Sequence, residues 1–163
     1  MLSQNKRQAG RSQSDPMISN RDTIVISSLI TMRSWEVLTK IIMEKPVFAK
    51  VSIPVYQRGK HFLRLPIHEV CSNKPPLSLM KKLVSAYPTS LIINDKNDGC
   101  LPIHYACRHA ASVEVISYLM KQMPSSINFQ DKYGCTPAVI AGRSSCKHRD
   151  QIVRLFQSAA NAA

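Results

Sequence analysis

Apolar residues recur at helical spacing in four stretches of the chain. In the two central stretches the pattern starts at Leu77 and at Val113, and each stretch ends just before a proline, Pro88 or Pro124, which cannot continue a helix. The pattern predicts four helices, each with one apolar stripe. The positions that form these stripes are Trp35, Leu38, Ile41 and Ile42; Leu77, Met80, Leu83 and Val84; Val113, Ile116, Leu119 and Met120; and Ile152, Val153, Leu155 and Phe156.

The chain also repeats itself with a period of about 36 residues. Leu65-Pro66-Ile67-His68 recurs as Leu101-Pro102-Ile103-His104, 36 positions later, and Thr136-Pro137 follows after a further 35. Tyr87-Pro88-Thr89-Ser90 matches Met123-Pro124-Ser125-Ser126 in the same register. So many matches at one spacing indicate an array of similar structural units.

Each unit is predicted to be a short helix, a turn and a longer helix. Proline suits the first turn of a helix, because its missing N–H would have no partner there, so a first helix is expected at about 102–108. The second helix of that unit should start near Ser112. Asn97-Asp98-Gly99 signals a tight turn before the first helix of the unit. Residues 23–32 are rich in β-branched side chains and could form a strand, but the repeat context favours a helix.

These units suggest a simple domain organisation. Residues 1–20 are polar without periodicity and are predicted to be disordered. The rest, about 21–160, is predicted to be one repeat domain, divided into a degenerate N-terminal repeat (21–62), two clear repeats (63–98 and 99–133) and a C-terminal capping repeat (134–160). We expect Val51 to Leu63 to be an irregular loop of reduced stability, because it contains Pro54 and Arg58-Gly59-Lys60.

Two segments, Asp95 to Cys107 and Asp131 to Gly142, resemble the ankyrin repeat pattern D-x-x-G-x-T-P-L-H-x-A-A, with one extra residue at Asp98. The resemblance covers about residues 22–160, and Tyr-Pro-x-Ser after the second helix resembles a divergent ankyrin subfamily. It implies an all-α fold, a short α-solenoid of helix–turn–helix repeats joined by tight turns. The sequence departs from the pattern where Leu65 and Leu101 replace the capping Thr and where Val139 replaces the His.

Composition and charge limit the compartments and the classes of partner that are compatible with the chain. The 163 residues suffice for one domain, and the formal net charge of +12 favours acidic partners such as nucleic acid, an anionic membrane or an acidic protein. The basic excess is spread along the chain without a basic tail, which weakens the nucleic-acid interpretation. The sequence shows no apolar run long enough to span a membrane, no secretory signal and five cysteines without a C-x-x-C motif. An intracellular protein with reduced thiols, cytoplasmic or nuclear, is predicted; organellar targeting stays an open alternative.

Candidate chemistry is sparse, and no enzyme activity, metal or cofactor is expected. The familiar nucleophile, phosphate-loop and metalloprotease motifs are missing from the sequence. Residues 95–99 start like a calcium loop, but Ala106 stands where a bidentate Glu is needed, so a turn is predicted. A zinc site would need side chains from two neighbouring helices, 8–10 Å apart, which is too far for ligands of one zinc ion. The residues concerned are His68, Cys71, His104 and Cys107, and we assign them structural roles.

The resemblance also suggests where a partner would bind. In ankyrin-like stacks, the turn tips and the exposed side of the first helices form a concave surface that usually contacts partners. On this mapping, Lys96 and Lys132 align along the turns and Arg108 and Arg143 along the helices, giving a positive stripe that Asp98 partly offsets. The alternative is that a charge of +12 simply places basic residues everywhere. The predicted partner-binding residues are Arg64, Lys96, Asn97, Arg108, His109, Lys132, Tyr133 and Arg143.

Two functions are compatible with this interpretation. The favoured one is a non-catalytic protein–protein interaction module that binds an acidic partner through its concave face, by analogy with the fold. The alternative is binding of nucleic acid or another polyanion through the basic stripe, with affinity that falls steeply as salt rises. The chain could also be part of a longer repeat array, although the polar positions of its last predicted helix are typical of a cap.

Overall fold

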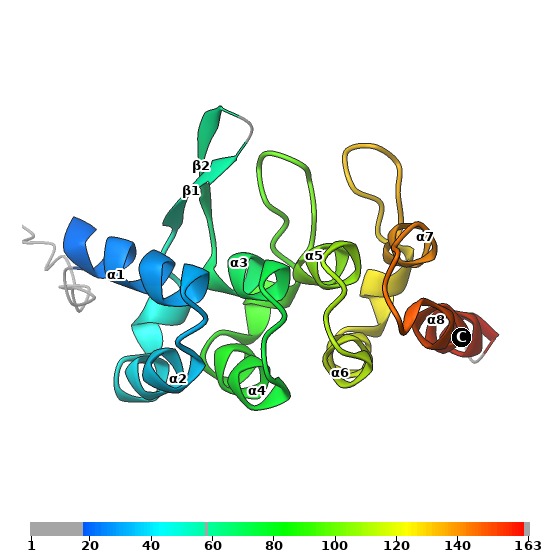
Figure 1. Ribbon diagram of the computed structural model, residues 1–163, viewed down its shortest axis with the longest axis horizontal. Helices are drawn as coiled ribbons and strands as arrows, with labels where there is room; N and C mark the ends of the chain where they lie inside the picture. Colours follow the sequence, from blue (N-terminus) through cyan, green and yellow to red (C-terminus); the bar gives the residue numbers. More distant parts are fainter. Residues whose placement is uncertain (1–17, 58, 162–163) are drawn as a thin grey trace, which may run out of the picture.

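A computed structural model describes residues 18–57 and 59–161, and it consists of two rows of helices crowned by projecting turns (Figure 1). Helices of one row pack on their neighbours in that row, α3 on α5 and α5 on α7, and likewise α2 on α4, α4 on α6 and α6 on α8. The predicted short all-α solenoid is confirmed. The inner row comprises α1 (Asn20–Thr31), α3 (Pro66–Ser72), α5 (Pro102–Arg108) and α7 (Pro137–Gly142), and the outer row α2 (Trp35–Glu44), α4 (Leu77–Ala86), α6 (Val113–Gln122) and α8 (Arg149–Asn161).

Short polar side chains start several of these helices. The Ser112 hydroxyl accepts the backbone N–H of Val115 at the start of α6, and Thr136 does the same for Val139 at the start of α7. Leu101 has no side chain that could cap α5. There the backbone N–H of Leu101 donates instead to Nδ1 of His104, at 3.1 Å.

A proline turn follows each of the first three outer helices. These 3-10 turns are η1 (Pro46–Ala49), η2 (Pro88–Leu91) and η3 (Pro124–Asn128). The residue before each proline is forced out of the helical conformation, which ends the helix. The buried hydroxyls of Ser90 and Ser126 then donate to the carbonyls of Tyr87 and Met123, both at 2.6 Å. The Tyr-Pro-x-Ser segment is thus a helix stop in which the serine donates both its backbone N–H and its hydroxyl to the carbonyl of the residue before the proline.

The prediction of an irregular loop at Val51 to Leu63 is wrong, because this segment forms an antiparallel β-hairpin. Strand β1 (Ile53–Gln57) pairs with β2 (Lys60–Arg64), with Val55 opposite Phe62. Side chains alternate along the strands: Ile53 is buried, whereas Tyr56 is exposed. Pro54 is tolerated because a two-stranded sheet has only edge strands, where a missing N–H is compatible with pairing. Its carbonyl accepts the Ser27 hydroxyl of α1, which ties the hairpin to that helix.

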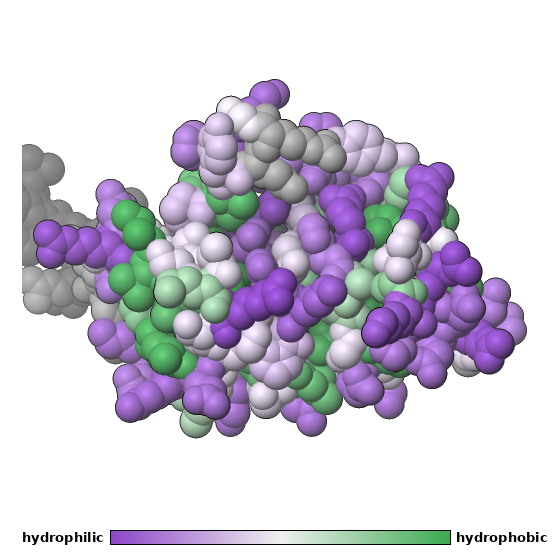
Figure 2. Space-filling model, viewed as in Figure 1, coloured by the Kyte–Doolittle hydropathy of each residue, from purple (hydrophilic) through white to green (hydrophobic). Residues whose placement is uncertain are grey.

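The two ends of the stack differ in polarity. Residues 20–31 form a helix, as the repeat context predicted, and Ser19 caps it through a capping box with Asp22. The prediction of disorder for residues 1–20 falls mostly outside the described residues, and the repeat boundaries remain a prediction. Apolar surface gathers over α1 and α2 (Figure 2). It includes the exposed side chains of Ile24, Val25, Met32, Val37 and Met43.

The last helix, α8, is polar on its exposed side and buries Ile152 and Phe156 against the stack, as predicted for the C-terminal unit. None of the helices described here is sufficiently long and apolar to span a membrane.

Neighbouring turns touch at one close backbone contact. The backbone N–H of Lys132 donates to the carbonyl of Asp98, at 2.9 Å, and so ties the turn of one repeat to the turn of the next. Gly99 makes this possible: its φ is +67°, and an added Cβ would lie 3.1 Å from the Lys132 nitrogen. Gly134 has a φ of +73° but no neighbour within 4 Å of such a Cβ.

Replacing these two glycines by alanine should therefore have unequal effects. Gly134→Ala is expected to cost about 1 kcal/mol, the cost of a Cβ in the left-handed region. Gly99→Ala should cost about 2–3 kcal/mol, because the Cβ also presses against the Lys132 backbone. Urea unfolding of the two variants measures the difference, and equal losses would show that the contact between the turns contributes nothing.

Candidate functional site

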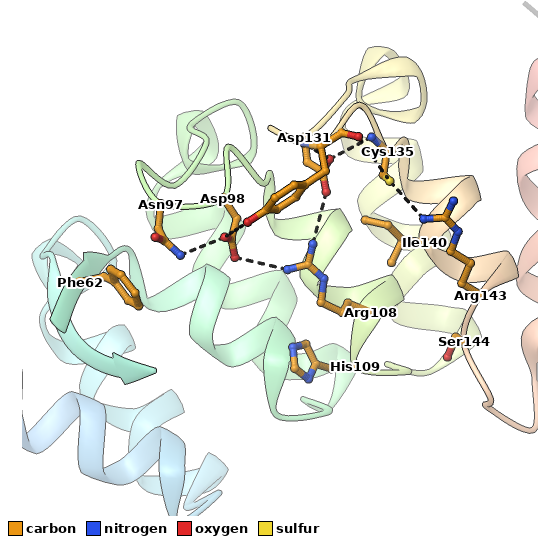
Figure 3. A pocket seen from close by; sticks show the side chains of 11 residues that line it. Phe62, Asn97, Asp98, Arg108, His109, Asp131, Cys135, Ile140, Arg143 and Ser144 are labelled. Atoms are coloured by element: carbon orange, nitrogen blue, oxygen red, sulfur yellow. Dashed lines mark hydrogen bonds and ion pairs between the residues drawn. The ribbon is translucent and has the colours of Figure 1, made fainter. Parts of the chain in front are cut away.

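A groove of about 580 Å³ lies on the inner side of the stack, between the turns and the inner helices α5 and α7. Figure 3 shows side chains from three successive projections, the β-hairpin and the two turns, converging on it. Its lining mixes charged, aromatic and apolar groups. The lining residues are Phe62, Asn97, Asp98, Arg108, His109, Asp131, Tyr133, Cys135, Ile140, Arg143 and Ser144.

The structure brings most of the predicted partner-binding residues to this groove. Asn97, Arg108, His109, Tyr133 and Arg143 line it. A second hollow, of about 470 Å³, lies between β2 and the turn at residues 93–97. Two more of the predicted residues, Arg64 and Lys96, line it, and Asn97 lines both hollows. Lys132 lies on the next turn, where its Nζ donates to the Asn97 carbonyl at 3.3 Å.

Each turn is folded by the first aspartate of its repeat. Oδ1 of Asp95 accepts the backbone N–H groups of Asn97 and Asp98, at 2.8 and 2.9 Å. Oδ2 of Asp95 accepts the Tyr105 hydroxyl, at 2.7 Å. Burial alone would raise the pKa of Asp95, but these hydrogen bonds and the nearby Arg64 outweigh it and hold that pKa below its ordinary value. Segment 95–99 is therefore the turn that the sequence predicted.

Asp131 repeats this arrangement and adds a link between repeats. Its Oδ1 accepts the backbone N–H groups of Tyr133 and Cys135, both at 2.9 Å. Its Oδ2 accepts from the guanidinium of Arg108 on α5, at 3.3 Å. Arg108 also reaches Oδ2 of Asp98, at 3.5 Å, and therefore clamps two successive turns (Figure 3).

Arg64 is a buried structural cation. Only 4% of its surface is exposed, and it forms ion pairs with Glu69, at 3.3 Å, and with Asp98, at 4.0 Å. Its guanidinium lies 4.6 Å from the centroid of the Tyr105 ring, and that of Arg108 lies 5.6 Å from the same ring. Tyr105 is thus held between two cations while its hydroxyl binds Asp95.

The predicted positive stripe is consequently divided into two kinds of residue. Arg64 and Arg108 are paired with carboxylates, so much of their charge is neutralised inside the protein. Lys96, Lys132 and Arg143 are exposed, and within the described parts of the chain no carboxylate pairs with them. A molecule approaching the turns therefore meets these three cations first.

The buried histidines, in the neutral state, tie the inner helices α3 and α5 to the segments that lead into the following turns. Nε2 of His68 lies 2.9 Å from the Ile93 carbonyl, and Nε2 of His104 lies 3.0 Å from the Phe129 carbonyl. Since Nδ1 of His104 accepts from Leu101, its proton resides on Nε2, which donates to the carbonyl. Burial lowers the pKa of both imidazoles, to about 4 for His68. Burial and the charge of Arg108 also lower the pKa of His109 in the groove.

The cysteines are arranged for packing. All five are free, and burial raises the pKa of Cys71 and Cys107, and that of Cys100 to about 12, so these thiols stay protonated. Among the described side chains, no group of three His, Cys, Asp or Glu residues is placed to hold a metal ion.

Sequence reasoning missed the groups that balance the arginines. Glu69 and Tyr105 were not selected, and Asp95 and Asp131 were seen only as turn residues. A signal was present, because the Asp-Lys pair recurs at residues 95–96 and 131–132, 36 positions apart. An aspartate repeated at the start of a turn predicts a carboxylate that accepts backbone N–H groups there.

The Tyr105 hydroxyl should contribute measurably to stability. Tyr105→Phe keeps the ring between Arg64 and Arg108 but removes a hydrogen bond to a buried charged carboxylate, so a loss of about 1.5–3 kcal/mol is expected. Tyr118→Phe, on the outer helix α6, serves as the control and should change little. Denaturant unfolding checks this, and a loss no larger than that of the control would contradict the role given to the hydroxyl.

Stability should also decrease on mild acidification. Below pH 6.5 the unfolded chain protonates His68, whereas the folded protein keeps it neutral down to about pH 4. This contribution is complete above pH 6.5 and is lost progressively between pH 6.5 and about 4, by about 3 kcal/mol. His68→Gln should flatten the slope of unfolding free energy against pH, whereas His61→Gln, at an exposed position, should not. An unchanged slope in His68→Gln would contradict the assignment.

Comparison with known proteins places this architecture in a family. The family model for ankyrin repeats, in three copies, matches residues 67–162, which is more than half of the chain. No curated protein sequence matches the chain. On the strength of that match and of the stacked helix–turn–helix units, the chain belongs to the ankyrin repeat family.

Proposed function

We propose that the chain is a non-catalytic binding module whose concave groove takes an acidic segment of a partner protein. Ankyrin repeats are generally protein–protein interaction modules. The observation that carries the finer proposal is the division of charge at the groove: Arg64 and Arg108 are neutralised internally, whereas Lys96, Lys132 and Arg143 present unpaired charge to the outside.

The groove offers both an exposed aromatic side chain and neighbouring cations to a partner. Tyr133 is 65% exposed at the edge of the groove, and its hydroxyl lies 3.5 Å from Oδ1 of Asp98. Ile140 and Phe62 add apolar surface below it. A partner segment with an apolar or aromatic side chain flanked by carboxylates would pack on Tyr133 and pair with the neighbouring cations.

The positions of the cations favour a partner recognised by its side chains. Lys96 and Lys132 stand on turns whose backbone is fixed by Asp95 and Asp131, so their Cα atoms are held in place. Both side chains are exposed, and Nζ of Lys132 also donates to the Asn97 carbonyl. Charges placed in this way steer an acidic partner and fix its register more than they add affinity.

Nucleic acid is the second candidate, because the net charge is +12. Two observations weigh against it at this groove. Asp98 and Asp131 line the groove, and phosphates tracking along it would approach their carboxylates. Arg64 and Arg108, which the sequence placed in the basic stripe, are already engaged in ion pairs.

Charge reversal on the turns tests the proposal. The variant Lys96→Glu with Lys132→Glu is compared with Lys81→Glu with Lys82→Glu, which makes the same charge change on the outer helix α4. Proteins captured from a source-cell lysate, with and without nuclease, are identified and their binding is measured with purified components. The turn variant should lose an acidic partner by about tenfold or more, whereas the α4 variant should keep it.

Two outcomes would contradict this proposal. Equal binding by both variants would remove the turn lysines from the interface. Capture that disappears with nuclease, and affinity that falls steeply with salt, would transfer the function to nucleic acid.

A further inference from the structure

We propose that the groove ends in a pocket for a phosphoryl group, so that the partner segment carries a phosphorylated serine or threonine. The inference rests on the proposed function, because the same groove would hold the segment. A hollow of about 520 Å³ continues the groove beyond α5 and α7. The two hollows share Arg108, His109 and Ser144, so one path leads from the turns to this pocket.

The phosphoryl pocket is formed where three inter-helix loops meet. One loop, between α3 and α4, contributes Lys74, and a second, between α5 and α6, contributes Ala110. The loop between α7 and α8 contributes Ser144, Ser145, Cys146, Lys147 and His148, and the end of α5 contributes Arg108 and His109. These loops face the viewer in Figures 1 and 2, and hydrophilic side chains prevail on this side from α3 onward.

The lining of the pocket contains basic and hydroxyl side chains but no acidic ones. Lys74 and Lys147 are exposed cations, and Arg108, although paired with Asp98 and Asp131, also lines the pocket together with His109 and His148. The hydroxyls of Ser144 and Ser145 are further donors. No carboxylate occurs among the nine residues that line the pocket, whereas Asp98 and Asp131 line the other part of the path. The lining at the loop end therefore carries positive charge without a carboxylate, whereas the lining toward the turns carries both signs.

The loops are held in place before any ligand arrives. Lys74 and Ala110 both have a φ of +55°, so the backbone reverses its direction sharply after α3 and again after α5. The backbone N–H of Ala111 donates to the Ala106 carbonyl, at 2.9 Å, and that of Ser144 to the Ala141 carbonyl, at 3.1 Å. Fixed loops reduce the entropy lost when the cations gather around an anion.

A phosphoryl group fits this lining better than a carboxylate. A phosphorylated side chain carries close to two negative charges and three acceptor oxygens, which matches several cations and hydroxyl donors. Helix α8 begins at Arg149, directly after the pocket, so its dipole adds positive potential. Two acidic side chains lie close to this loop: Asp150 pairs with Arg149 at 3.1 Å, and Glu114 lines an adjoining hollow together with His148.

The pocket suits one phosphoryl group, not a row of them. Nucleic acid presents a phosphate at every nucleotide and needs cations along its track. Here the continuation of the path mixes the ion-paired Asp98 and Asp131 with cations, instead of the row of cations that successive phosphates need. A peptide with a single phosphorylated residue does not need such a row, because its remaining side chains need not be phosphorylated.

Backbone amide NMR of the isotope-labelled full chain tests the proposal. The probes are N-acetyl-phosphoserine amide, the same compound without phosphate, inorganic phosphate and a short oligothymidylate. The phosphoserine compound should shift the amides of Lys74, Ala110 and residues 144–148, and the unphosphorylated compound should not. The variant Lys74→Glu with Lys147→Glu should weaken this response by about tenfold or more. The control Lys81→Glu with Lys82→Glu should preserve it.

Four results would overturn the proposal. They are shifts spread evenly over the surface, a response unchanged in Lys74→Glu with Lys147→Glu, a stronger response to inorganic phosphate than to the phosphoserine compound, and an oligothymidylate response that extends over the turns. The variant Lys96→Glu with Lys132→Glu separates this proposal from the proposed function. It should keep the phosphoserine response even though it loses the partner, so each proposal can fail without the other.

Discussion

The structure depends on how its buried aspartates are satisfied. Asp95, Asp98 and Asp131 are nearly inaccessible to water, and a buried carboxylate without partners would cost several kcal/mol. Each instead accepts backbone N–H groups, a tyrosine hydroxyl or a guanidinium. The same contacts fold the turns, fix the angle between each turn and the inner helices, and hold Arg64 and Arg108. Turn shape, repeat stacking and groove electrostatics therefore share one set of interactions.

Repeat architecture made much of the fold predictable from the sequence. The helices, their proline starts and stops, and the tight turns follow from residues that act locally, such as Pro102, Ser112 and Pro124. The hairpin at residues 53–64 was missed because Pro54 argued against a strand, whereas a two-stranded sheet has only edge strands, where proline is compatible with pairing. The two strands themselves are adjacent in sequence, so their pairing is local, and Gly59, with a φ of +76°, was the turn signal that could have revealed it.

The candidate site was predicted only in part for a related reason. Lys96, Lys132 and Tyr133 were placed on turns from the register alone, and the turns lie there. The pairing of Arg64 and Arg108 did not follow from the register, because it depends on carboxylates further along the chain or in a neighbouring turn, Asp98 and Asp131. Charge counted along a sequence thus overestimates the positive potential of a surface when acidic residues of the turns fold back beneath it.

The division between fixed backbone and free side chain at the turn tips has an evolutionary consequence. Asp95 and Asp131 hold the turns through backbone N–H groups, which every non-proline residue possesses. The bonds that these aspartates accept do not involve the side chains of Lys96 and Lys132, although Nζ of Lys132 also donates to the Asn97 carbonyl of the neighbouring turn, at 3.3 Å. Substitutions at these tips can therefore accumulate under selection for a new partner while the aspartates preserve the scaffold. A lineage carrying this chain could change what it recognises long before it changes how it folds.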